Sequence, residues 1–400
     1  MILIGEALIG AGNEVAHVDL VIGNKSGPVG TAFVNGLTNL SAGHTPLIAV
    51  IKPNLPTKPS TLIVPKVTVK GMEQASQIFG PAQMGVAKAI ADSVAEGVIP
   101  EDKVNDWVII ASVFIHPAAK NYRKIYQYNY GATKLSIRRA LANYPPIDKI
   151  LKEKDRSLHP IMGFRPNTLW NPPYLQVALD TGTIDSALKV ISVLPKSERI
   201  LIEIGTPLLK QGGVDNCIEK VREIKQNAYI IADMKTMDVG RAEVAIAANA
   251  TADAVVVSAV AGVEVISEFV TEANKQGIHA WIDSMNVSFD DLVQLLKELK
   301  EKPRVVILHR GIDQEEAKTS PWGDLSRIKE ATKDKSFVAV AGGIKPNNET
   351  FNRAMKEKVE IIIVGRYIYR SPDPYRAAQQ FLDYFEADPD TMRLFDKIDY

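Results

Sequence analysis

Apolar and polar segments alternate regularly along the second half of the chain, from Leu175 onward. Short apolar runs of strand length recur there, and a stretch with the apolar spacing of an amphipathic helix follows each run. The eight runs are Leu175–Leu179, Ile200–Ile204, Tyr229–Ala232, Ala254–Val257, Ala280–Ile282, Val305–Leu308, Phe337–Ala341 and Ile361–Val364. The clearest helices are predicted over Val263–Ala273 and Phe289–Leu299. Eight strand–helix repeats over about 225 residues predict an α/β fold, the (β/α)8 TIM barrel.

The first half of the chain lacks this repeat. Strands are predicted over Glu14–Ile22, Thr45–Ile51, Thr61–Val69 and Val108–Ile115, and helices over 81–97 and Asn129–Ala142. Along the first of these strands, His17 and Asp19 point to one face and the apolar residues point to the other. Pro65 inside the third strand indicates a sheet edge or a bulge. This order of elements favours an α+β domain.

The segment Ile150–Pro173 separates the two patterns. It begins with the charge run Lys152–Arg156 and continues with closely spaced proline, glycine and asparagine residues. Such a composition is typical of a linker. We therefore predict a boundary near residue 161, with domains over 1–161 and 162–400.

The composition excludes some classes of partner. Lys+Arg and Asp+Glu both number 47 in 400 residues, so no general attraction to nucleic acid or to an anionic membrane is expected. The single cysteine suits a reducing compartment. The apolar N-terminus has no basic leader, and the longest dense apolar run, Trp107–Ile115, is shorter than the roughly 18 residues of a membrane span. These features predict a cytoplasmic protein.

A motif of the form D-x-K-x-x-D follows the apolar run Tyr229–Ala232. Asp233 and Lys235 share a face at the strand end, and Asp238 stands at the start of the next helix. Taken alone, three charges in a solvated loop would be the simpler interpretation. The predicted barrel favours a site, because the C-terminal ends of barrel strands carry the chemistry.

Other strand ends carry polar side chains or glycines as well. They are Asp180, Glu203, Asp283 and His309, then Gly342 and Gly343, then Gly365 and Arg366. Glycines after the seventh and eighth strands let backbone N–H groups approach an anion, and an arginine adds donors. A glycine pair alone is usually a turn, but two such turns at these places predict a phosphate site.

In the first domain His17 and Asp19 form a candidate acid–base pair, although a structural histidine is the more common case. The segments Glu14–Gly23, Val64–Val69 and Phe79–Ala87 resemble the formaldehyde-activating enzyme family, and the similarity covers about residues 1–160. The resemblance implies a ribosomal protein S5 domain 2-like fold, a pentamer, and condensation of formaldehyde with tetrahydromethanopterin. It also implies that His17 donates a proton and that the pocket is lined by Asp19, Ile48, Lys66, Thr68 and Gln83, with isoleucine replacing the family's leucine at position 48.

The second domain resembles the orotidine 5′-monophosphate decarboxylase superfamily through Leu175–Asp180 and the D-x-K-x-x-D motif. Within that superfamily, Glu203–Pro207 and the segment 309–313 resemble 3-hexulose-6-phosphate synthase. That family joins formaldehyde to D-ribulose 5-phosphate reversibly and uses Mg²⁺.

The resemblance assigns roles to the residues at the strand ends. Glu203 and Asp233 offer hard oxygen ligands for Mg²⁺, and His309 is the candidate for moving the substrate proton. The predicted catalytic residues are His17, Lys235, Asp238, His309 and Asp180. An imine at Lys235 is disfavoured, because flanking carboxylates stabilise the ammonium. In the superfamily the aspartate at the position of Asp238 reaches the partner subunit's site, which implies a barrel dimer.

Together the two resemblances imply an archaeal bifunctional lyase that acts on small molecules, with the barrel running toward ribulose 5-phosphate. Two alternatives stay open at this point. The barrel could decarboxylate 3-keto-L-gulonate 6-phosphate, and the first domain could be a pterin-binding or assembly module.

Overall fold

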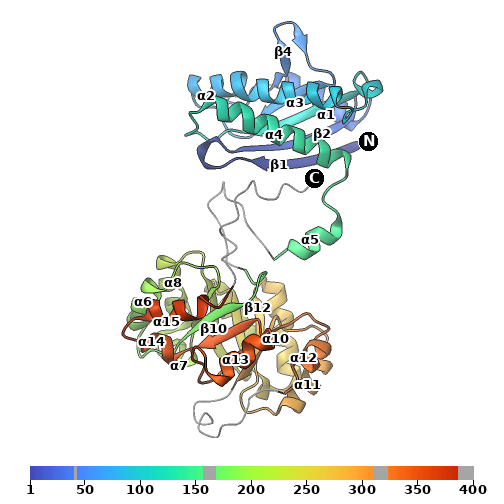
Figure 1. Cartoon of the computed structure of the whole chain (residues 1–400). Coiled ribbons are helices and arrows are strands. Elements are labelled where there is room, and N and C mark those ends of the chain that lie inside the picture. The colour runs from blue at the N-terminus through green and yellow to red at the C-terminus, as the bar shows by residue number, and fades with distance from the viewer. Residues whose placement is uncertain (40–42, 156–167, 310–322, 386–400) are drawn as a thin grey trace. The chain divides into compact units, whose positions relative to one another are not determined.

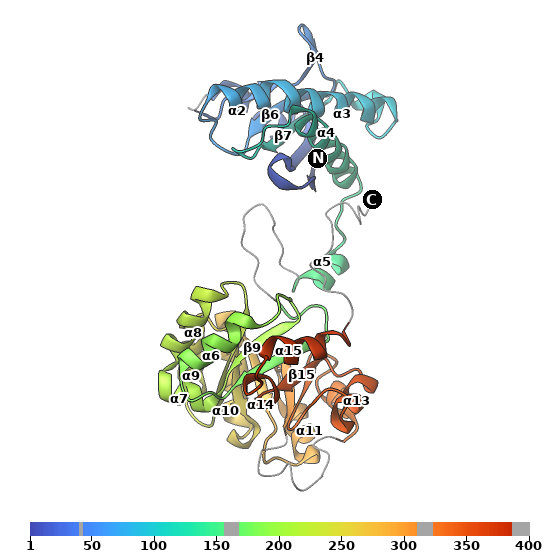
Figure 2. The same cartoon turned by 60° about the vertical axis from the view of Figure 1, so that its left-hand side comes forward.

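The computed structural model describes residues 1–39, 43–155, 168–309 and 323–385. The chain divides into two compact units, one holding Met1–Lys154 and the other beginning at Asp155 (Figures 1 and 2). The predicted domain boundary near residue 161 lies outside the described residues. Within the described ranges, no helix combines the length and the apolar character that crossing a membrane requires.

A five-stranded mixed sheet forms the centre of the first unit, in the order β1-β2-β7-β6-β3. Its strands are β1 Ile2–Ile9, β2 Ala16–Asn24, β3 Leu47–Ile48, β6 Ser60–Pro65 and β7 Trp107–Phe114, and a separate hairpin is made by β4 Val50–Lys52 and β5 Leu55–Pro56. The helical elements are η1 Gly12–Glu14, α1 Pro28–Thr38, α2 Met72–Gln77, the π-helix η2 Ile78–Ala82, α3 Gln83–Ala95, η3 Glu101–Lys103, α4 Tyr122–Leu141 and α5 Ile147–Glu153.

The two faces of this sheet have different neighbours. Val18 and Leu20 of β2 belong to the core shared with α3 and α4, whereas Val21 packs beside Phe33 of α1. Because side chains alternate along a strand, His17 and Asp19 lie on the α1 side, away from the main core. The predicted two-faced pattern of this strand is confirmed.

Several predicted elements of the first unit were wrong in extent. β1 and α1 were not predicted, and the single strand expected over Thr45–Ile51 is divided between β3 and β4, which belong to different sheets. The strand expected to reach Val69 ends at Pro65, although the next N–H, that of Lys66, still donates to the Val113 carbonyl of β7. Pro81 does not begin a helix but lies inside η2, where a π-turn accommodates the missing donor.

The second unit confirms the predicted barrel. Eight parallel strands close in the order β10-β11-β12-β13-β14-β15-β8-β9. They are β8 Tyr174–Leu179, β9 Ile200–Ile204, β10 Tyr229–Thr236, β11 Ala254–Ser258, β12 His279–Asp283, β13 Val305–His309, β14 Phe337–Ala341 and β15 Ile361–Val364. The helical elements are α6 Ile184–Val193, α7 Thr206–Gly212, α8 Val214–Ile224, α9 Gly240–Asn249, η4 Ala259–Ala261, α10 Val263–Gln276, α11 Phe289–Glu298, α12 Leu325–Ala331, α13 Glu349–Lys356, α14 Arg366–Tyr369 and α15 Pro374–Leu382. β10 extends past its predicted end to include Asp233 and Lys235.

The N-terminal end of the barrel is covered by the chain that enters it. Leu169 is fully buried in the cluster that fills the barrel interior. The Tyr174 hydroxyl accepts hydrogen bonds from the backbone N–H groups of Trp170 and Asn171, both at 2.8 Å. The Arg304 guanidinium donates to the Leu169 carbonyl. The side chains that close this end are therefore structural, and the charged strand ends lie at the opposite end.

Candidate active sites

The end of β10 is distorted where the D-x-K-x-x-D motif lies. The pairing of β10 with β11 shifts register between Ala232 and Thr236, and Lys235 has a φ of 45°. This left-handed conformation is costly for a residue with a Cβ and is typical of functional sites. Simple strand alternation therefore does not by itself place the Lys235 side chain; the bulge also contributes.

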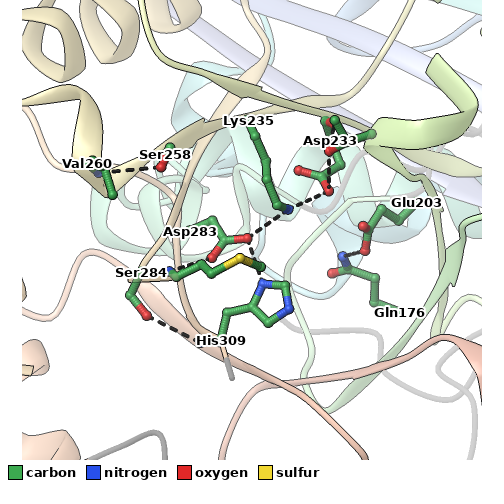
Figure 3. Close-up of polar contacts among 11 residues, drawn as sticks. Gln176, Glu203, Asp233, Lys235, Ser258, Val260, Asp283, Ser284 and His309 are labelled. Atoms are coloured by element: carbon green, nitrogen blue, oxygen red, sulfur yellow. Dashed lines mark hydrogen bonds and ion pairs between the residues drawn. The ribbon is translucent and has the colours of Figure 1, made fainter. Parts of the chain in front are cut away.

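Lys235 lies between two buried carboxylates. Its Nζ is 2.7 Å from Asp233 Oδ2 and 2.9 Å from Asp283 Oδ2 (Figure 3). Burial opposes the charged form of the lysine, but the attraction of Asp233 and Asp283 is stronger and raises the pKa of Lys235. The side chain is thus held as an ammonium, and an ammonium cannot attack a carbonyl. This supports the expectation that no imine forms at Lys235.

Asp283 joins Lys235 to His309. His309 Nδ1 is 2.8 Å from Asp283 Oδ2, and the other carboxylate oxygen accepts the N–H of Met285 at 2.9 Å. Burial alone would raise the pKa of Asp283, but its hydrogen bond to His309 and the nearby Lys235 charge lower it overall. An ionised carboxylate at Nδ1 assigns the proton to that nitrogen, so His309 Nε2 is the nitrogen available for proton transfer.

The sequence placed Asp283 at a strand end but gave it no role. In the structure it is the shared partner of the two predicted catalytic residues Lys235 and His309 (Figure 3). Its position at the end of β12, one strand removed from β10 in the barrel, was the available signal.

Glu203 and Asp233 form an acidic pair beside this network. Glu203 accepts a hydrogen bond from Gln176 Nε2, and Asp233 Oδ2 accepts one from Thr206 Oγ1 at 3.0 Å. Burial, followed by the charge of Asp233, raises the pKa of Glu203 well above its usual value. Two carboxylates that destabilise each other's charge are suited to share a cation.

The residues of this pair fit a divalent cation. Asp233 Oδ1 is buried and has no hydrogen-bond partner, which is costly for an isolated carboxylate oxygen. Across the described ranges, no group of three or more His, Cys, Asp or Glu side chains is arranged as a metal site. Mg²⁺ needs no such group, because it commonly takes one or two carboxylates and completes its shell with water and substrate oxygens.

Asp180 stands directly after β8 and depends on a glycine. A Cβ added to Gly205 would lie 1.9 Å from Asp180 Oδ1, so a larger residue there would displace this carboxylate from its present position. Although much of the Asp180 residue is exposed, partial burial of its carboxylate and then the charge of Asp233 raise the pKa of Asp180. The structure therefore places Asp180 close enough to Asp233 for the Asp233 charge to affect the pKa of Asp180.

Replacing Gly205 by alanine is expected to lower the free energy of unfolding of the barrel by about 1 kcal/mol, the lower end of overpacking costs, because the Asp180 carboxylate can rotate away but the backbone oxygen of Leu179, 3.1 Å from the added Cβ, cannot. Urea denaturation followed by circular dichroism would measure the change. Gly182→Ala is the matched control, because a Cβ at Gly182 meets no atom within 4 Å. Equal stability of the two variants would contradict the role given to Gly205.

The predicted phosphate site has the backbone that the sequence suggested. Gly342 and Gly343 follow β14 with φ values of 112° and 62°, a region that favours glycine. Gly365 precedes the short helix α14, which begins at Arg366. Arg366, Arg370 and Arg376 line a cavity of about 450 Å³. Asp373 also lines this cavity and the three glycines do not, so phosphate binding at the glycine turns stays a prediction.

Asp238 is the one residue of the motif that the structure does not bring into the cluster. Its side chain is exposed, and Oδ1 accepts the N–H of Val239 at 2.7 Å. The flanking apolar residues Met237 and Val239 are 52% and 61% exposed. The predicted position past the strand, before α9, is confirmed.

His17 in the first unit lies in a charged cluster. His17 Nε2 is 2.8 Å from Glu6 Oε1 and 3.5 Å from Asp19 Oδ1. Lys66 Nζ is 2.5 Å from Asp19 Oδ2 and 3.2 Å from His17 Nδ1. An ammonium only donates, so Nδ1 accepts from Lys66 and Nε2 carries the proton that faces Glu6. The structure thus brings together the predicted residues His17, Asp19 and Lys66.

Glu6 is a member of this cluster that the sequence did not reveal. It lies opposite Asp19 in the β1–β2 ladder, and β1 was not among the predicted strands. The hydrogen bond from His17 lowers the pKa of Glu6, despite the opposing effect of burial. Glu6 is therefore an ionised partner that orients the imidazole.

The remaining predicted pocket residues have other partners. Thr68 Oγ1 is 2.8 Å from His44 Nε2, a histidine that the sequence did not single out. Gln83 is buried, and its Oε1 accepts the N–H of Val50 at 2.7 Å, so it also anchors the start of the β4–β5 hairpin. Ile48 lies in β3 and is 37% exposed, more than a core residue would be.

Comparison with known proteins covers both units. Residues 4–162 match the family described as formaldehyde-activating enzyme (Fae), and residues 173–381 match the orotidine 5′-phosphate decarboxylase / HUMPS family. A protein named "Bifunctional enzyme Fae/Hps" from Methanosphaera stadtmanae is 55% identical over 397 residues, 98% of this chain and 97% of its own length. The protein of that name from Methanosarcina mazei is 53% identical over 383 residues, 96% of each chain.

Among solved structures, 3-hexulose-6-phosphate synthase from Salmonella typhimurium is similar to the second unit. It is 30% identical, covers 52% of this chain and 97% of its own, and has a TM-score of 0.47.

Proposed function

The chain belongs to the family of bifunctional Fae/Hps enzymes, and we propose that it carries two activities on formaldehyde, one in each domain. The first domain, residues 1–161, condenses formaldehyde with tetrahydromethanopterin to 5,10-methylenetetrahydromethanopterin. The barrel domain, residues 162–400, interconverts D-arabino-hex-3-ulose 6-phosphate with D-ribulose 5-phosphate and formaldehyde. The observation that carries the proposal for the barrel is the Lys235–Asp283–His309 network at its C-terminal end.

The barrel reaction makes or breaks a carbon–carbon bond next to a carbonyl, so negative charge develops on the sugar oxygens as an enediolate. The Lys235 ammonium stabilises that charge from a fixed position in a largely buried site. In cleavage, His309 Nε2 takes the proton from the hydroxyl of the carbon that leaves as formaldehyde, and after the carbon–carbon bond breaks it gives that proton to the enediolate carbon to form ribulose 5-phosphate. Synthesis runs the same steps in reverse, and Asp283 keeps the imidazole in the required tautomer. Asp180 offers a further carboxylate at the same end of the barrel.

Glu203 and Asp233 would hold Mg²⁺, which supplies positive charge where the enediolate develops. The orphaned Asp233 Oδ1 and the raised pKa of Glu203 support this assignment. Gln176 and Thr206 orient the two carboxylates through hydrogen bonds. The phosphate of the sugar would rest on the turns of Gly342, Gly343 and Gly365 and on the Arg366 side chain.

Removing divalent cations with a chelator is expected to slow hexulose 6-phosphate cleavage by about 100-fold, since a bound cation typically contributes several kcal/mol. Because the pKa of Glu203 is raised, its proton must leave before the cation binds, so Mg²⁺ affinity should increase as pH rises toward that pKa and level off above it. Calorimetric titration of Mg²⁺ at several pH values measures this dependence. Full activity after chelation would show that the assignment to Glu203 and Asp233 is wrong.

In the first domain a pterin amine adds to formaldehyde to give a carbinolamine, and loss of water then needs a proton on the departing hydroxyl. His17 supplies it as a general acid. The proton that His17 would donate is the one on Nε2, beside Glu6 and Asp19, while Nδ1 accepts from Lys66 and is thereby held in place. Thr68, Gln83 and Ile48 line the pocket for the pterin.

We also propose an oligomer in the cytoplasm. Asp238 is exposed and flanked by the exposed apolar residues Met237 and Val239, which suits a residue that reaches the site of a second barrel. The first domain would assemble as a pentamer.

The barrel would run toward ribulose 5-phosphate, so the formaldehyde that it releases becomes the substrate of the first domain.

The coupled reaction tests the whole proposal. Full-length protein receives hexulose 6-phosphate, Mg²⁺ and tetrahydromethanopterin, and the appearance of methylene-pterin is followed. We expect product that requires both Lys235 and His17. Release of free formaldehyde without accelerated capture would leave the barrel assignment intact and refute the one for the first domain.

A further inference from the structure

His44 holds together the segment that follows β6. Its Nδ1 is 3.3 Å from the Pro65 carbonyl oxygen, and its Nε2 is 2.8 Å from Thr68 Oγ1. The Gly43 carbonyl, one residue earlier, accepts the N–H of Val69 at 2.8 Å. A Cβ at Gly43, whose φ is 74°, would lie 2.5 Å from Thr68 Cγ2. Residues 43 and 44 are therefore closely fitted to the segment from Pro65 to Val69.

The contacts of His44 determine which groups donate. A backbone carbonyl can only accept, so the proton of the neutral imidazole lies on Nδ1, facing Pro65. Nε2 is then an acceptor, and the Thr68 hydroxyl must donate its proton to it. The Thr68 oxygen, which is on an exposed residue, is left with lone pairs only. A ligand group that bonds to this oxygen must be a donor.

Lys66, two residues earlier, has its own anchors. Its backbone N–H donates to the Val113 carbonyl at 2.9 Å, and its Nζ is 2.5 Å from Asp19 Oδ2. Loss of the His44 contacts should therefore disturb Thr68 more than the charged cluster around His17.

We propose that His44 is a positioning residue that fixes the Thr68 hydroxyl as a hydrogen-bond acceptor for an N–H or NH2 group of the pterin. This inference rests on the proposed function of the first domain, in which Thr68 lines the pterin pocket. In this arrangement the Thr68 oxygen selects the edge of the pterin that carries hydrogen-bond donors. His44 affects pterin binding only through Thr68 and does not touch the substrate.

A double-mutant cycle on the full-length protein tests the inference, with tetrahydromethanopterin and formaldehyde as substrates. His44→Phe and Thr68→Val are each expected to raise the KM for the pterin about tenfold, the value of one hydrogen bond, with kcat changed less than about threefold. The double variant should be no worse than either single variant, because both remove the same interaction. His44→Gln, whose Oε1 can accept from Thr68, should stay within about twofold of the wild-type KM.

Multiplying effects in the double variant, or an unchanged pterin KM in His44→Phe, would overturn the inference. If His44→Phe does not fold, His44→Gln against Thr68→Val decides, and a tenfold increase in both overturns it. Failure of the proposed function looks different, because the wild-type protein would then show no accelerated condensation at all.

Discussion

Replacing Asp283 by asparagine is expected to lower kcat for hexulose 6-phosphate cleavage by about 10³-fold, within the range of acid–base contributions. The carboxylate accepts from His309 Nδ1 at 2.8 Å and pairs with Lys235 Nζ at 2.9 Å, so its loss affects both residues. An amide cannot balance the ammonium, and it allows the other imidazole tautomer, in which Nε2 carries the proton. Steady-state assays with ribulose 5-phosphate as the detected product measure the change.

Asp253→Asn is the matched control for Asp283→Asn. The Asp253 carboxylate is partly buried and is paired with Arg222 at 2.7 Å, but it lies directly before β11, away from the catalytic end. We expect Asp253→Asn to affect stability and leave kcat within a few fold. Pterin condensation should be unchanged in both variants, because it depends on the first domain. A kcat close to wild type in folded Asp283→Asn would remove Asp283 from the mechanism.

The second large effect is expected for His17→Ala, which should lower the enzyme-accelerated rate of pterin condensation by about 10²–10³-fold. Alanine removes the proposed proton donor and the hydrogen bond to Glu6, while Lys66 and Asp19 keep their direct ion pair at 2.5 Å. The rate of methylene-pterin formation is measured after subtraction of the uncatalysed reaction.

The barrel provides the control for His17→Ala. Cleavage of hexulose 6-phosphate should keep its wild-type rate, since no barrel residue is altered. Condensation at the wild-type rate would support the view that the first domain only binds pterin or assists assembly. Glu6→Gln tests the partner separately: an intermediate loss is expected, because the amide still accepts from His17 Nε2 but carries no charge.

The sequence predicted the barrel well because its signal is local. Much of the barrel consists of short apolar runs buried on both faces, such as Ala254–Val257 of β11, and amphipathic helices follow them. The strand ends also follow from topology, since parallel strands place Asp180, Glu203 and His309 at the same end. The fold therefore fixes which residues are close to the site before any contact is known.

The contacts within the sites were less predictable. The role of Asp283 depends on a register shift in β10 and on the left-handed backbone of Lys235, which no apolar pattern encodes. Glu6 required β1, whose residues do not alternate clearly because it is an edge strand with Ile2 and Ile4 exposed. His44 acts through a loop contact with Thr68 that spans 24 positions in the sequence.

Leu169 and the backbone around it close the N-terminal end of the barrel, so the C-terminal end is the one through which ligands can pass. The Leu169 side chain and the hydrogen bonds of Tyr174 and Arg304 close the N-terminal end, and apolar side chains fill the barrel interior. Formaldehyde and the five-carbon sugar phosphate must therefore both enter and leave through the C-terminal end of the barrel. Two products that leave through the same opening obstruct each other, so the closed end of the barrel imposes an order on their release. Product-inhibition kinetics can determine that order.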